Sequence, residues 1–147
     1  MATIPVLAGQ VRIVEAIETR KRTATADVDI TEGQVVYKLA NGKVGLARAN
    51  AAGTAKPYGI ASKNVAAKRA GEFVHYGGLA GFDLSGTNPG TTVYLSSATA
   101  GAVDNARTSG SGNVVVPIAV VDNDTNPNLR RFLWVDFSLA GDPVALP

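Results

Sequence analysis

Short apolar segments separated by glycine-rich turns are the feature that most limits the folds open to this chain. Runs rich in Val, Ile and aromatic residues alternate with clusters of Gly, Asn, Asp, Ser and Thr, and 16 of the 147 residues are glycines. This pattern predicts strands joined by turns. The candidate strands cover residues 10–17, 25–30, 34–39, 58–61, 72–76, 91–95, 114–121 and 130–137.

Helix signals are weak by comparison. Residues 47–52 and 64–69 are the alanine-rich stretches that predict a short helical turn, and Gly53 and Gly71 would end them. The chain is therefore predicted to be all-β, a compact β-barrel or sandwich of about eight short strands with extended terminal arms.

The domain boundaries follow from the ends of the strand pattern. Residues 10–138 form the predicted barrel domain. Residues 1–9, restricted by Pro5, and residues 139–147 are expected to be arms that either reach a neighbouring molecule or fray.

Three segments carry local signals for their place in a sheet. The Asn41-Gly42 pair predicts a type I′ hairpin between residues 35–39 and 43–46. Pro117 indicates an edge, a bulge or the start of a strand. Residues 130–137 carry bulky apolar side chains on both faces, so this strand is predicted to be central or half-buried in another subunit.

The two halves of the chain also resemble each other. Seven residues of the first half recur in the second at offsets of 57 to 59 residues, which favours two related β-units on one core. The alternative is that such short motifs recur in unrelated β-proteins. The pairs are Gly33/Gly90, Val36/Val93, Tyr37/Tyr94, Gly42/Gly101, Val44/Val103, Ile60/Ile118 and Ala61/Ala119.

Composition excludes several kinds of chemistry. The chain has no cysteine and one histidine, so thiolate nucleophiles, disulfides, iron–sulfur clusters and Cys- or His-rich metal centres are absent. A length of 147 residues favours one domain. No apolar run approaches a membrane span, and the N-terminus lacks a secretory signal, so we expect synthesis in the cytoplasm and no membrane partner.

The charge is divided unevenly along the chain. The net charge is +2, but residues 1–75 carry 11 Lys and Arg against 6 Asp and Glu, whereas residues 76–147 carry 3 against 6. The resulting +5 and −3 halves favour either a mixed solvated surface or an oriented contact with a charged partner.

Candidate catalytic groups lack the required neighbours. The cluster at residues 108–112 departs from Gly-x-Ser-x-Gly spacing and is predicted to be a loop. His75 lies within a predicted strand, which favours a structural or partly exposed histidine. The pairs Asp27/Asp29 and Glu15/Glu18 have the pattern of solvated surface. We expect no enzyme activity and no small-molecule substrate.

Ion and phosphate sites are also weakly indicated. Asp122, Asp124 and Asn126 match the start of a calcium loop, but Pro127 stands at its glycine position and Leu133 at its glutamate position, so an Asx-rich turn is favoured. Residues 77–81 lack the order of a phosphate-binding loop. No cofactor is predicted.

Nucleic-acid binding requires basic residues interleaved with aromatic ones. The clusters Arg20-Lys21-Arg22 and Lys68-Arg69 have no aromatic neighbour in the sequence. An acidic protein surface is therefore the favoured partner, and no nucleic acid is expected.

The order of motifs resembles the small head decoration, or cement, proteins of tailed bacteriophages. Gly-x-x-Val-Tyr, an Asn-Gly hairpin, Gly-Ile-Ala, Ala-Gly-Glu-x-Val, a Gly-rich turn and a second Gly-x-x-Val-Tyr-Leu follow one another. They stand at residues 33–37, 41–44, 59–61, 70–74, 81–84 and 90–95, within a resemblance that spans about residues 30–121. Residues 86–90 and the tail after Phe137 match no part of it.

This resemblance implies a β-barrel-like structural protein without catalytic residues. It implies a homotrimer on the outer capsid surface of the virion, where it clamps neighbouring major capsid protein subunits. The basic residues expected to face the capsid are Arg20, Lys21, Arg22, Lys68 and Arg69. The alternatives are another β-barrel virion component of a tail, collar or fibre, and a glycan-binding β-barrel module.

Overall fold

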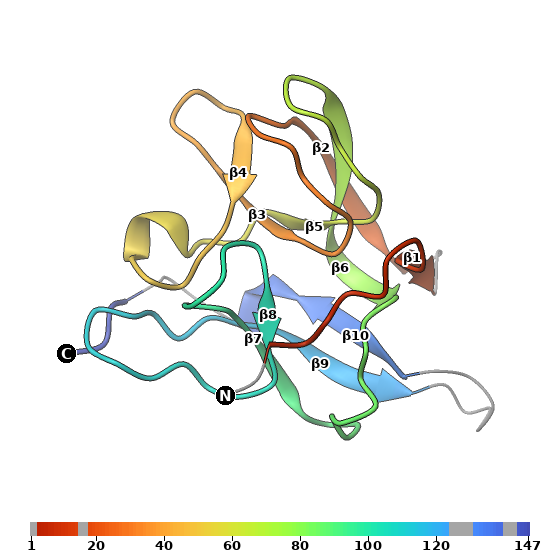
Figure 1. The fold of residues 1–147 in the computed structure, drawn as a ribbon, viewed down its shortest axis with the longest axis vertical. Helices are drawn as coiled ribbons and strands as arrows, with labels where there is room; N and C mark the ends of the chain where they lie inside the picture. Colours follow the sequence, from red (N-terminus) through yellow and green to blue (C-terminus); the bar gives the residue numbers. More distant parts are fainter. Residues whose placement is uncertain (1–2, 15–17, 124–130, 140–143) are drawn as a thin grey trace.

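The chain is all-β, as predicted, in a computed structural model that describes residues 3–14, 18–123, 131–139 and 144–147. Ten antiparallel strands form one curled sheet, and the only helices in these ranges are the 3-10 turns η1 (Ala52–Thr54) and η2 (Phe137–Leu139) (Figure 1). The strands are β1 (Arg12–Val14), β2 (Arg20–Thr25), β3 (Val35–Lys38), β4 (Val44–Leu46), β5 (Gly59–Ala61), β6 (Ala70–Ala80), β7 (Thr92–Leu95), β8 (Val103–Asp104), β9 (Pro117–Asn123) and β10 (Arg131–Asp136).

Strand β6 is the longest, and both of its edges are paired. β2 and then β1 lie along one edge, with Arg20 opposite Tyr76 and Val14 opposite Gly78. β5 and then β10 lie along the other edge. The sheet therefore forks at β6, into a first branch of β5, β3 and β4 and a second branch of β10, β9, β7 and β8.

The fork separates two hydrophobic cores. The main core contains side chains from both branches, whereas the second core lies on the other face of the first branch. Because side chains alternate along a strand, adjacent residues enter different cores. These pairs are Val35 and Val36 on β3, Ile60 and Ala61 on β5, and Val74 and Phe73 on β6. All six side chains are fully buried.

The two branches repeat one topology. Each contains a hairpin, β3–β4 or β7–β8, and then a strand that pairs with the first strand of that hairpin. In the sequence repeat, Lys38 corresponds to Leu95 and Val44 corresponds to Val103. Lys38 lies opposite Val44 in the first hairpin and Leu95 lies opposite Val103 in the second, so the two hairpins have the same register. The repeat inferred from the sequence is thus confirmed as a repeat of strand order and hairpin register.

Several local predictions are confirmed. The hairpin at Asn41-Gly42 forms between β3 and β4, but the predicted type I′ turn is wrong, because Gly42 has a φ of +85° whereas the φ of Asn41 is not positive. Pro117 is the first residue of β9, beside an irregularity in its pairing with β7. β10 is a central strand, since it pairs with both β6 and β9.

Other local predictions are wrong. No α-helix forms at residues 47–52, because Ala47 and Ala49 are core residues whose N–H groups donate to the carbonyls of Val35 and Ser96. Residues 64–69 form a turn instead of a helix, with Lys68 at a φ of +69°.

Two strand boundaries also differ from the prediction. No strand forms over the predicted residues 25–30 beyond Thr25, since β2 lies earlier in the chain, at Arg20–Thr25. β6 continues beyond Tyr76 to Ala80, because the glycines at its end permit close approach of neighbouring backbone.

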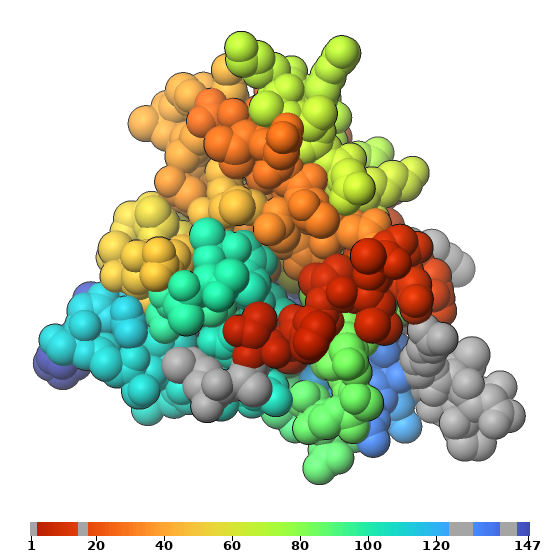
Figure 2. Space-filling model, viewed as in Figure 1, coloured from red at the N-terminus to blue at the C-terminus, as the bar shows by residue number. Residues whose placement is uncertain are grey.

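The described parts of both terminal segments contact the barrel. The N–H groups of Ile4 and Leu7 donate to the carbonyls of Val103 and Gly81, each at 2.8 Å. Figure 2 shows this N-terminal segment, in red, running between the orange first-branch surface and the teal and green surface below it. At the other end, Leu146 exchanges backbone hydrogen bonds with the 112–113 turn.

The fold predicts a strong penalty for a side chain at Gly77. Gly77 has a φ of +120°, and a Cβ there would lie 2.5 Å from the Thr19 Cα. We expect Gly77→Ala to lower the free energy of unfolding by about 2 kcal/mol or more, because backbone strain adds to overlap. Urea unfolding measures this loss as a lower midpoint at an unchanged m-value.

Gly86→Ala is the matched control for this experiment. Nothing lies within 4 Å of a Cβ built on Gly86, and its φ is not positive. Its free energy of unfolding should change by less than about 0.5 kcal/mol. Equal midpoints for the two variants would contradict the role assigned to Gly77.

Candidate functional site

Strand β2 presents the basic triplet Arg20, Lys21 and Arg22 along the edge of β6. All three residues are exposed, and in the described chain β2 pairs with β6 alone. The pairing register shifts between Arg20 and Lys21. The three cations therefore project into different surroundings and are best considered one by one.

Lys21 is paired with an acid. Its Nζ lies 2.8 Å from Oε2 of Glu72, in an ion pair between two exposed side chains. The hydrogen bond from Lys21 and its charge lower the pKa of Glu72. Such surface pairs contribute little to stability. Lys21 is thus the cation of the triplet whose charge is already balanced within the chain.

Arg22 lies against a tyrosine supplied by another part of the sheet. Its guanidinium is 5.0 Å from the ring centroid of Tyr58 and donates a long hydrogen bond of 3.4 Å to the Tyr58 carbonyl. Lys38, at the end of β3, places its Nζ 4.9 Å from the same ring centroid. One aromatic ring therefore holds two cations by cation–π contact.

Arg20 has a similar aromatic neighbour. Its guanidinium is 5.8 Å from the ring centroid of Tyr76, which packs edge-to-face on Trp134 at 5.5 Å. The basic triplet has no aromatic neighbour in the sequence, but in the folded chain two of its members lie against tyrosine rings. Strand pairing brings Tyr76 to Arg20 from a distant part of the sequence, which residue-by-residue inspection cannot detect.

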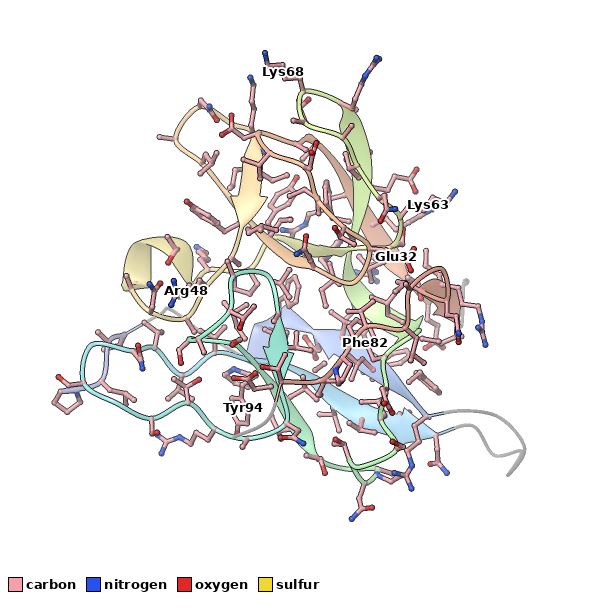
Figure 3. The ribbon with its side chains drawn as sticks, viewed as in Figure 1. Glu32, Arg48, Lys63, Lys68, Phe82 and Tyr94 are labelled. Atoms are coloured by element: carbon pink, nitrogen blue, oxygen red, sulfur yellow. The ribbon has the colours of Figure 1, made fainter. Side chains whose placement is uncertain are left out.

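Lys68 and Arg69 lie at the far end of the same edge. They form the turn before β6, where Lys68 N–H donates to the Ala26 carbonyl and Ala26 N–H donates to the Arg69 carbonyl. Figure 3 shows Lys68 at the tip of this turn, pointing away from the barrel. β2 and β6 thus join the two basic clusters along one continuous edge. We call Arg20, Lys21, Arg22, Lys68 and Arg69 the basic edge.

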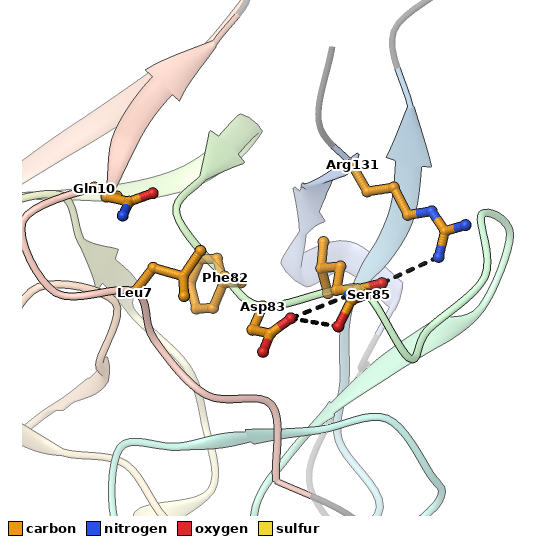
Figure 4. A pocket seen from close by; sticks show the side chains of 7 residues that line it. Leu7, Gln10, Phe82, Asp83, Ser85 and Arg131 are labelled. Atoms are coloured by element: carbon orange, nitrogen blue, oxygen red, sulfur yellow. Dashed lines mark hydrogen bonds between the residues drawn. The ribbon is translucent and has the colours of Figure 1, made fainter. Parts of the chain in front are cut away.

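A separate pocket lies between the N-terminal segment and the chain after β6. Its volume is about 520 Å³, and Leu7, Phe82 and Leu84 supply its apolar lining. Figure 4 shows Asp83 and Arg131 at this pocket, each in hydrogen bonds with residues of the loop that follows β6.

The polar groups of this pocket are engaged in holding the local structure. Asp83 accepts hydrogen bonds from the N–H and the hydroxyl of Ser85, which lower its pKa. Arg131 donates to the carbonyls of Leu84 and Thr87. Asp83 and Arg131 therefore fix the loop between β6 and β7.

The described candidate catalytic residues lie in ordinary structural settings. His75 is half-buried in β6, and Asp29 accepts a hydrogen bond from the Ala67 N–H. Asp122 accepts a bond from the Asn123 N–H, whereas Asp124 and Asn126 of the possible calcium loop lie outside the described residues. Glu15 also lies outside them.

The described ranges contain no group of three or more His, Cys, Asp or Glu side chains placed to hold a metal ion. Among the same residues, no helix is long and apolar enough to cross a membrane.

No family model, curated protein or solved structure matches the chain.

The basic edge predicts an unusual titration of the single histidine. Burial, then the charges of Arg22 and Arg20, lower the pKa of His75 below its ordinary value of about 6.5. The unfolded chain therefore binds the proton more readily, so stability falls as the pH drops below about 6.5 toward the folded-state pKa. An NMR titration of the ring proton should give a pKa below 6.5.

A His75→Gln variant tests the same linkage through stability. Its free energy of unfolding should change less between about pH 7 and pH 5.5 than that of the native chain. A folded-state His75 pKa at or above 6.5, with equal pH dependence of both proteins, would contradict the assignment.

Proposed function

We propose that this protein is a structural virion protein that binds the outer surface of a tailed-phage capsid and stabilises it by clamping neighbouring coat subunits. The observation that carries the proposal is the basic edge, a set of cations on β2 and on the turn that leads into β6, a strand that contributes to both cores. Charges fixed on a rigid surface are suited to steering and orienting a protein partner.

Two further features support this function. The order of strand and turn motifs resembles that of the head decoration proteins over about residues 30–121. Asp83 and Arg131 of the 520 Å³ pocket are committed to the loop that they stabilise, which favours a structural role for these two charged groups over a catalytic one.

The proposed partners are the major capsid protein and further copies of this chain in a trimer. A tail, collar or fibre component is the alternative within the virion. Clustering of Tyr76 with Trp134 is the observation that favours the glycan-binding alternative, since aromatic rings pack on sugars. Oligosaccharide binding without capsid binding would select that alternative.

Capsid binding is tested by cosedimentation with expanded, undecorated capsids of the same phage. The double variant Arg20→Glu/Arg22→Glu should bind roughly tenfold more weakly at low salt, because each reversal places a like charge against an acidic coat surface. Native binding should weaken as salt is added, and the variant should show a smaller salt dependence.

Arg107→Glu is the control for charge reversal at a position outside the basic edge. Arg107 is exposed and lies in the second half of the chain, away from the basic edge. Its reversal should leave capsid occupancy within about twofold of the native value. Unchanged occupancy of the Arg20→Glu/Arg22→Glu variant at low and high salt would overturn the assignment of the basic edge. A native chain that ignores capsids would overturn the function itself.

A further inference from the structure

A second pocket lies beside the basic edge, around Tyr58. Its volume is about 400 Å³, and its walls come from β2, from the end of β3, from η1 and from the segment that leads into β5. The lining residues are Arg22, Tyr37, Lys38, Ala52, Gly53, Lys56, Pro57 and Tyr58. We call it the Tyr58 pocket.

The Tyr58 pocket has a strong excess of positive charge. Arg22, Lys38 and Lys56 line it, and no Asp or Glu does. The one ion pair in the described ranges joins Lys21 to Glu72, so it balances none of these three charges. Like charges that converge without a counter-charge repel one another, and a bound anion relieves that repulsion.

The pocket is also held in shape by the sheet. The Tyr58 N–H donates to the Val36 carbonyl at 2.8 Å, and the next residue, Gly59, pairs with Val36 in the β3–β5 ladder. Gly59 packs against Phe73, since a Cβ built there would lie 2.4 Å from the Phe73 Cβ. Tyr58 is therefore fixed by the second core, and its ring holds Arg22 and Lys38 in place.

We propose that the Tyr58 pocket binds a carboxylate side chain from an extended acidic segment of a partner protein. Arginine and lysine donate charge-assisted hydrogen bonds to carboxylates, and a pocket of this volume holds such a side chain with its flanking backbone. The inference rests on the proposed function for the identity of that partner, the coat subunit. It adds a defined anchor point to a contact that otherwise depends on general charge attraction.

Nucleic acid fits this pocket less well. Single strands bind by stacking bases on aromatic faces along a basic groove. Here the Tyr58 ring is already contacted by two cations, and Tyr37 packs partly buried against the main core. A carboxylate needs only the cations, which the pocket supplies.

A peptide titration tests the pocket directly. The probes are a fluorescein-labelled peptide of alternating Gly and Asp, and its counterpart with Asn in place of Asp. The native chain should bind the Asp peptide and not the Asn peptide. Lys38→Ala/Lys56→Ala should weaken binding roughly tenfold, since it removes two of the three donors. Both side chains are exposed, so circular dichroism should be unchanged.

Lys63→Ala/Arg107→Ala is the matched control, because it removes the same charge from two exposed positions outside the pocket. It should bind the Asp peptide within about twofold of the native chain. Equal loss in both double variants would overturn the pocket as a specific site. Equal binding of the Asn peptide would also overturn it, as would stronger binding of oligothymidylate, which would select nucleic acid.

Capsid cosedimentation of the same variants separates this inference from the proposed function. We expect the native and control chains to bind capsids and the pocket variant to bind them more weakly. If the pocket variant binds capsids as well as the native chain, the anchor fails and the function stands. If the native chain binds the Asp peptide but no capsid, the proposed function fails and the carboxylate site stands.

Discussion

The close packing around strand β6 is the constraint on which the rest of the structure depends. β6 is paired on both edges and contributes Val74 to the main core and Phe73 to the second core. Glycines make this possible: a Cβ at Gly77 or Gly78 would overlap Thr19 or Val14 of the strands and turn alongside. Larger residues at these two positions would push β1 and the start of β2 away from β6.

The position of the basic edge follows from this constraint. β2 has one paired edge in the described chain, and exposed edge strands invite pairing with other chains. Lysine and arginine on such a strand suppress edge-to-edge association, and this would explain the triplet without any partner. That explanation requires charge but no particular geometry. It leaves unexplained why Arg22 and Lys38 converge on one fixed tyrosine from two different strands.

Sequence patterns predicted the elements whose signals are local. The Asn41-Gly42 turn is fixed locally, by the positive φ of Gly42 and by the hydrogen bond from the Lys43 N–H to the Asn41 side chain. β10 carries enough apolar bulk on both faces to require a central place. β2 was missed because its charged residues show no apolar alternation, and its stability comes from pairing with β6. The alanines near residue 47 were misassigned because small residues also fill tight core positions. The partners of Arg20 and Arg22 are brought by strand register, so they appear only in three dimensions.

The internal repeat shows which part of the Tyr58 pocket the topology itself does not require. Lys38 and Leu95 occupy equivalent hairpin positions, opposite Val44 and Val103. Leu95 is buried in the main core, and its N–H donates to the Val116 carbonyl. Lys38 is exposed instead, and its Nζ lies 4.9 Å from the ring centroid of Tyr58. The hairpin therefore forms with either an apolar core residue or a surface lysine at this position. Because the topology does not require a cation there, the lysine supports the assignment of the Tyr58 pocket as a binding site.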